Sequence, residues 1–98
     1  MTTGEGLDRL TILELRMRYG RTAKERERAK DEWDDLIMEV DTFAHSATYH
    51  ALARLNRIMW FATDAARRAT DPEWKGYLAT CLLELNQQRR KAIREANR

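Results

Sequence analysis

The segment TAKERERAKDEWDDLIMEVDTFA (residues 22–44) has the strongest helical pattern in the chain. It opens with a capping box, in which the Thr22 oxygen accepts a hydrogen bond from one free helix N–H and Glu25 reaches back to another. Its apolar residues recur at intervals of 4, 3, 1, 3, 3 and 1, the spacing of one helical face. We therefore predict a helix over 22–44. Its apolar face comprises Ala29, Trp33, Leu36, Ile37, Val40, Phe43 and Ala44.

Two further helices have clear end signals. A helix over 8–19 ends at Gly20, because a glycine commonly follows the last helical residue. A helix over 72–97 begins after Asp71, a good N-cap, with Pro72 at its first position. The core positions expected on these two helices are Leu10, Ile12, Leu13, Leu15, Met17, Trp74, Leu78, Cys81, Leu82, Leu85 and Ile93.

A fourth helix is predicted over 48–69, with Ser46 or Thr48 as its N-cap. No Gly or Pro separates it from the segment before, so one continuous helix over 22–69 is the alternative. Residues 1–7 are small, polar and Gly-containing, and we expect them to be only partly ordered. The core positions expected on the fourth helix are Tyr49, Leu52, Leu55, Met59, Ala62 and Ala66.

Length and composition favour a single all-α domain over 1–98. Four Gly and one Pro are too few for the many turns of a β-sandwich or barrel. Short loops make successive helices antiparallel, so we predict a small four-helix bundle or a pair of helical hairpins. A chain of 98 residues buries a thin core, and association would therefore stabilise it.

The sequence also predicts a soluble cytoplasmic protein. Cys81 is the only cysteine, so no internal disulfide can form. The first twenty residues lack the basic and apolar regions of a secretory signal. No uncharged stretch approaches the roughly 20 apolar residues that span a bilayer.

The charges are distributed unevenly. Residues 16–30 hold seven basic and two acidic side chains, whereas residues 31–41 hold six acidic ones and no basic one. The basic residues lie near the start of the predicted helix and the acidic residues near its end, and both positions are unfavourable for the helix dipole. Such a helix would pair with an antiparallel copy of itself, so we predict a two-fold homodimer or a higher homo-oligomer. Two solvated faces are the alternative. The predicted interface residues are Arg26, Lys30, Trp33, Asp34, Ile37 and Asp41.

A polar stripe lies on the helix over 48–69. Spacings of 4, 4 and 3 place Asn56, Trp60, Asp64 and Arg67 on one face. Asn86 and Arg89 of the last helix could complete a buried hydrogen-bonded network that sets the helix register. Alternatively, arginines could grip a phosphate or carboxylate while Trp60 stacks on a base or sugar. The candidate ligand-binding residues are Asn56, Trp60, Asp64, Arg67, Asn86, Arg89 and Arg90.

Acidic residues 32, 35 and 39 share a face, as in metal-dependent helical nucleotide pyrophosphatases. The later helices offer only Asp64 and Glu84 to complete such a site. Asp41, His45 and His50 lack a convincing further ligand for a transition metal. We therefore predict no catalytic residue, no metal site and no cofactor.

The basic C-terminal run argues weakly for nucleic acid, because no aromatic residues interleave with it and no helix-turn-helix pattern is present. We interpret it as a solvated helix end whose charges suit the helix dipole. Its residues are Arg89, Arg90, Lys91, Arg94 and Arg98.

Three blocks, LDRLTILELRMR (7–18), LNRIMWFATDAARR (55–68) and LLELNQQRRKAIREANR (82–98), resemble an uncharacterised bacterial family. It is a domain of unknown function often encoded near cell-surface polysaccharide genes. The resemblance implies an all-helical fold but gives no information about activity, and Thr63 departs from the acid that the family tends to carry. The matching residues are Gly4, Glu5, Asp8, Thr11, Ile12, Leu13, Glu14, Asn56, Trp60, Asp64, Arg67, Asn86, Arg89, Arg90 and Lys91.

Three functions follow as hypotheses. The first is a non-enzymatic homo-oligomeric interaction protein, and the second is a binder of a nucleotide or another anionic small molecule. An enzyme such as a nucleotide pyrophosphatase is the weakest. The first two differ in whether Arg67 and Arg89 pair with internal carboxylates or point into an open pocket.

Overall fold

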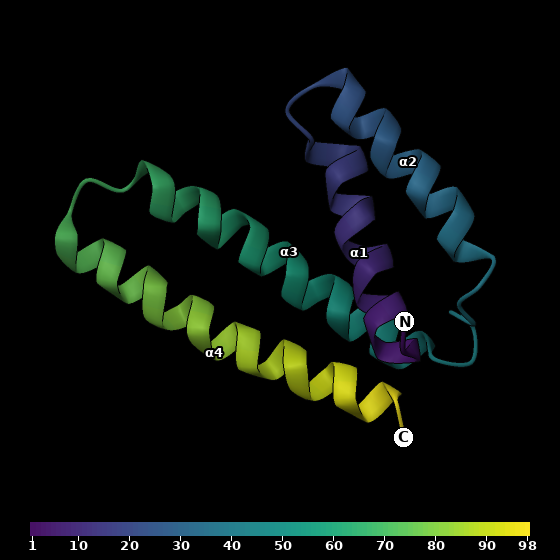
Figure 1. Ribbon diagram of the computed structural model, residues 1–98. Coiled ribbons are helices and arrows are strands. Elements are labelled where there is room, and N and C mark those ends of the chain that lie inside the picture. The colour runs from purple at the N-terminus through teal and green to yellow at the C-terminus, as the bar shows by residue number, and fades with distance from the viewer.

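The computed structural model describes residues 1–98 and contains four α-helices and no strand. They are α1 (Thr3–Tyr19), α2 (Ala23–Ile37), α3 (Ser46–Arg68) and α4 (Pro72–Ala96) (Figure 1). The predicted all-α fold with four helices is confirmed. No helix is long and apolar enough to cross a membrane.

The helices form two antiparallel hairpins that meet at one end and diverge (Figure 1). α1 and α2 form one hairpin, and α3 and α4 form the other. α1 contacts all three other helices, whereas α2 contacts only α1. The molecule is therefore a V with the start of α1, the start of α3 and the end of α4 at its vertex.

Two of the predicted caps are present. The Thr22 hydroxyl accepts from the Glu25 N–H at 3.1 Å, and the Glu25 carboxylate accepts from the Arg21 N–H at 3.0 Å. Asp71 accepts from the Glu73 N–H at 3.2 Å at the start of α4. These side chains bond helix N–H groups that would otherwise lack a partner.

The first helix begins five residues before the predicted start. Thr2 is its N-cap and accepts from the Glu5 N–H at 3.1 Å. Gly4 and Gly6 belong to the helix and allow other segments to approach it closely: a Cβ at Gly4 would meet the Ile93 backbone, and one at Gly6 the Val40 side chain. The prediction that residues 1–7 are only partly ordered is therefore wrong.

The second helix ends at Ile37, not at residue 44, and the continuous helix over 22–69 is excluded. No basic residue stabilises its last turn, where the acidic run is unfavourable for the dipole. Asp41 instead accepts from the Ala44 N–H at 2.9 Å, which stabilises a turn. α3 follows with His45 as its N-cap and no capping side chain, so neither predicted N-cap is used.

The core centres on α1. Leu7, Leu10 and Leu13 are almost completely buried, together with Leu52 of α3. Although α2 has the clearest periodicity, only its Ala29 is buried, because one neighbour covers the helix. The other predicted apolar residues of α2 within the helix are half-buried.

Two predicted core aromatics are exposed. Phe43 lies in the α2–α3 connection and is 92% exposed, because the helix ends before it. Trp74 is 47% exposed and stacks on Tyr77 with ring centroids 5.5 Å apart.

A pair of glycine variants tests the close approach of α1 and α4. Gly4→Ala would place a methyl group 2.9 Å from the Ile93 carbonyl carbon. We expect a loss of about 1–3 kcal/mol in the free energy of unfolding, measured by urea titration. Gly76→Ala is the matched control, because a Cβ there meets nothing within 4 Å. It should gain about 0.5–1 kcal/mol, and equal effects of the two changes would contradict the packing.

Candidate functional site

An ion pair joins α1 to α4 near the vertex. The Arg89 Nε donates to Asp8 Oδ1 at 2.8 Å, and a terminal nitrogen of Arg89 donates to Asp8 Oδ2 at 2.7 Å. The Asp8 side chain is 8% exposed and that of Arg89 is 27% exposed. This is the bidentate geometry in which arginine binds a carboxylate most strongly.

Asn56 of α3 adds a third helix to this pair. Its side-chain nitrogen donates to Asp8 Oδ1 at 2.8 Å and to the Thr11 hydroxyl at 2.7 Å. Thr11 donates in turn to the Asp8 carbonyl, and Arg89 to the Asn86 side chain at 3.1 Å. No buried side-chain polar atom in the protein lacks a partner. We call these five residues the polar network.

The polar network stabilises the charged form of Arg89. The hydrogen bond to Asp8 raises the pKa of Arg89 above its ordinary value, against the opposing effect of burial. The Asp8 charge adds to the increase. Each charge of the pair therefore stabilises the other, and Arg89 is directed into the protein rather than toward a ligand.

A second polar contact lies farther along α1. Glu14 accepts hydrogen bonds from the Tyr49 hydroxyl and, at 3.3 Å, from the Trp33 indole nitrogen. Burial, and then the bond to Glu14, raise the pKa of Tyr49. Glu14 thus joins α1 to α2 and to the start of α3, and Trp33 faces α1.

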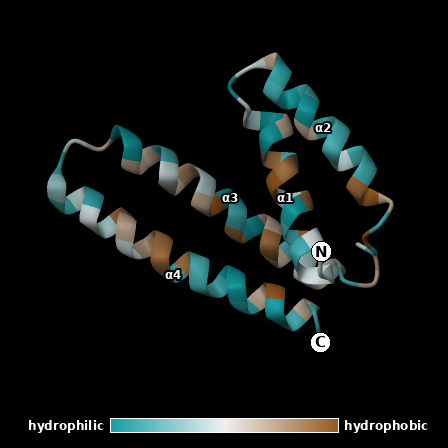
Figure 2. Cartoon of the chain, in the orientation of Figure 1, coloured by the Kyte–Doolittle hydropathy of each residue, from teal (hydrophilic) through white to brown (hydrophobic).

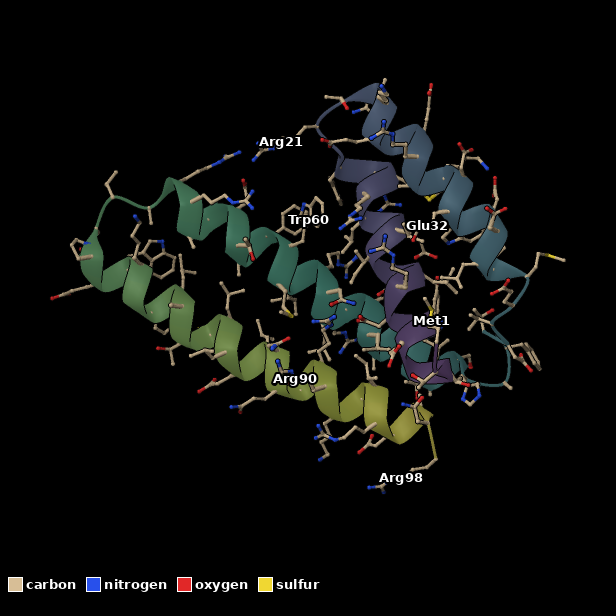
Figure 3. The ribbon with its side chains drawn as sticks, viewed as in Figure 1. Met1, Arg21, Glu32, Trp60, Arg90 and Arg98 are labelled. Carbon is tan, nitrogen blue, oxygen red and sulfur yellow. The ribbon has the colours of Figure 1, made fainter.

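An open cleft of about 1280 Å³ separates the two arms of the V. Figure 3 shows Trp60 projecting from α3 into this space and Arg21 extending toward α3 from the α1–α2 turn. Five of the predicted ligand-binding residues line it, and Asn86 and Arg90 do not. The five are Asn56, Trp60, Asp64, Arg67 and Arg89.

The predicted polar stripe is thus divided between two environments. Asn56 and Arg89 bond within the polar network, as expected for side chains of a buried hydrogen-bonded network. Asp64 pairs at 3.2 Å with Arg68 rather than with Arg67. Arg67 is exposed on the cleft wall without an ion pair.

Sequence reasoning missed the centre of the polar network. Asp8 and Thr11 entered only through the family resemblance, because their partners lie on distant helices. It also missed arginines of the other cleft wall: Arg16, Arg21 and Arg28. A signal was available in their clustering within the basic run over 16–30.

Several predicted interface residues bond within the chain. Arg26 donates to the Gly20 carbonyl at 2.7 Å, and Lys30 pairs with Asp34 at 2.9 Å one helical turn away. Asp41 bonds the Ala44 N–H, and Ile37 is half-buried. Their role between subunits stays a prediction.

No group of three or more His, Cys, Asp or Glu side chains is placed to hold a metal ion. Glu32, one of the three acids on a shared face, bonds Arg9, with a nitrogen–oxygen distance of 2.9 Å. This hydrogen bond lowers the pKa of Glu32. Cys81 is a half-buried free thiol.

Comparisons with protein-family models, curated proteins and solved structures found no match. The resemblance to the bacterial family therefore stays a prediction.

Removal of Asp8 tests the polar network. Asp8→Ala would leave Arg89 with an unpaired, largely buried charge, and we expect a loss of about 3 kcal/mol in urea-unfolding free energy. Asp64→Ala is the matched control, because it removes a carboxylate paired with an exposed arginine and should cost less than about 1 kcal/mol. The double variant Asp8→Ala/Arg89→Ala should lose less than the sum of the single changes. Additive losses would show that the two side chains do not interact.

Proposed function

We propose that this protein is a homodimeric interaction protein without catalytic activity, whose subunits join through the α3–α4 arm. The main support is a surface too large for a protein of this size. The chain exposes 7012 Å², whereas a compact monomer of 11.6 kDa exposes about 5,800 Å². The excess of roughly 1,200 Å² per subunit matches an interface of about 2,400 Å² in total, within the range of obligate homodimers.

The overall dimensions support the same proposal. The radius of gyration is 14.6 Å, and a compact domain of this length would have about 12.6 Å. The molecule measures 44 × 34 × 18 Å, so it is a thin plate rather than a sphere. A thin plate leaves helix faces that a second copy can cover.

The part of the arm beyond Asn56, residues 57–85, has the least core. Leu78 is its only buried residue. Apolar residues nevertheless recur along this part of the arm (Figure 2). Its other apolar side chains, such as Met59, Leu82 and Leu85, are half-buried or exposed, and packing of an apolar face supplies most helical stability. A further layer of helices packed on this arm would supply that stability.

The arm carries two apolar stripes outside the cleft lining. Spacings of 4 and 3 align Ile58, Ala62 and Ala65 along α3, and spacings of 3 and 4 align three residues of α4. None of the six lines the cleft. We call them the back face: Ile58, Ala62, Ala65, Trp74, Tyr77 and Cys81.

A second copy suits the back face. Ile58, Trp74 and Tyr77 are 45%, 47% and 61% exposed, and the two alanines would let a helix approach closely. Two back faces related by a two-fold axis would form a four-helix bundle from both α3–α4 arms. The α2 surface is a weaker candidate, because no large apolar residue of α2 is exposed.

The polar network supports a non-enzymatic role. Asp8 and Arg89 bond each other and Asn56, so neither side chain is free to transfer a proton. The proposed function is therefore to bind other molecules through the surface of a rigid homodimer.

Light scattering after gel filtration tests the dimer. The wild-type protein should have twice the 11.6 kDa mass of one chain. Ile58→Glu and Tyr77→Glu should each give the monomer mass or weaken dimerisation at least about 30-fold, because a charge would enter the apolar centre of the interface.

The controls are Met38→Ser and Phe43→Ser, which are 86% and 92% exposed in the α2–α3 connection. They remove similarly exposed apolar groups outside the back face and should stay dimeric. A wild-type monomer would overturn the proposal, and so would a dimer that the back-face variants leave unchanged.

A further inference from the structure

The cleft between the arms is strongly basic. Six arginines line it, against three acidic residues, Glu25, Glu32 and Asp64. Two of the arginines have ion-pair partners, since Arg89 binds Asp8 and Arg68 binds Asp64. The other four form no ion pair: Arg16, Arg21, Arg28 and Arg67.

Each acidic residue of the cleft already has a hydrogen-bond or ion-pair partner in the chain. Glu32 is held by Arg9, which lies outside the cleft, and Glu25 caps α2 through the Arg21 N–H. Asp64 is held by Arg68. None of the four guanidinium groups therefore has an ion-pair partner, and the four outnumber the three acids of the cleft, of which Glu32 also interacts with the Arg16 charge.

These four arginines belong to both walls. Three lie on the α1–α2 hairpin and Arg67 lies on α3. Like charges on two facing walls repel each other, and a multivalent anion between the walls would turn this repulsion into attraction to one ligand. Guanidinium groups suit phosphate, because each can donate two parallel hydrogen bonds.

Aromatic side chains stand beside the arginines. Trp60 is half-buried on the α3 wall. Tyr19 of α1 and Phe61 of α3 meet edge to face across the cleft, with ring centroids 5.1 Å apart. A planar base can stack on such rings, which a simple inorganic anion cannot use.

We propose that the cleft binds a nucleoside di- or triphosphate, with the phosphates held by arginines of both walls and the base stacked on Trp60. The cleft volume of about 1280 Å³ is ample, since sites for small molecules occupy about 300–1,000 Å³. Arg89 takes no part, because Asp8 holds it. The site goes beyond the proposed dimer, because the back face lies on the opposite side of α3.

Calorimetric titration with ATP, inorganic tripolyphosphate and adenosine tests the site. ATP should bind best, tripolyphosphate more weakly and adenosine weakest. Arg16→Ala and Arg67→Ala should each weaken ATP binding about tenfold or more through loss of charge-assisted hydrogen bonds to phosphate. Trp60→Leu should reduce the preference for ATP over tripolyphosphate.

Arg90→Ala is the matched control, because Arg90 is an exposed arginine that does not line the cleft, and it should leave ATP affinity unchanged. Absence of ATP binding would overturn the proposal, as would equal losses in the Arg90 and Arg67 variants. Ile58→Glu should bind ATP like the wild type, whether or not it dimerises. Loss of binding in that variant would show that the cleft is not an independent site.

Discussion

The buried carboxylate of Asp8 is the constraint on which the rest of the structure depends. A charge that is 8% exposed must be fully paired, and its partners come from two other helices, Asn56 on α3 and Arg89 on α4. A shift of one helix by a turn would break several of these bonds at once. The polar network therefore sets the register of α1 against the α3–α4 hairpin and holds the vertex of the V.

The open shape follows from where this constraint acts. The vertex contains the polar network and the most buried leucines, and α2 has only α1 to pack against. The charged residues of α2 give it no apolar surface for a third helix, and beyond the vertex the two arms meet where Tyr19 packs against Phe61. The cleft therefore lies between the α1–α2 hairpin and α3.

Local signals in the sequence predicted the four helices well, because caps and 3.6-residue periodicity act within one helix. They did not predict contacts between residues far apart in the sequence. Asp8 is 48 residues from Asn56 and 81 from Arg89, and no spacing rule connects these positions. Asn56 and Arg89 were found as polar residues on helix faces, yet Arg67 was grouped with them although it lies in a different environment. Periodicity shows that a face is apolar, and it does not show what covers that face.

Trp74 and Phe43 illustrate this last difference. Both were predicted in the core and both are exposed, but Phe43 follows the end of a helix and is an isolated apolar side chain, which is common on protein surfaces. Trp74 continues a stripe at helical spacing beside a second stripe on α3, and such a pattern has a physical effect only when another surface packs on it. The opposite side of α3 carries the charged Asp64 and Arg67 beside Trp60. The two sides of this one helix therefore favour two different kinds of partner.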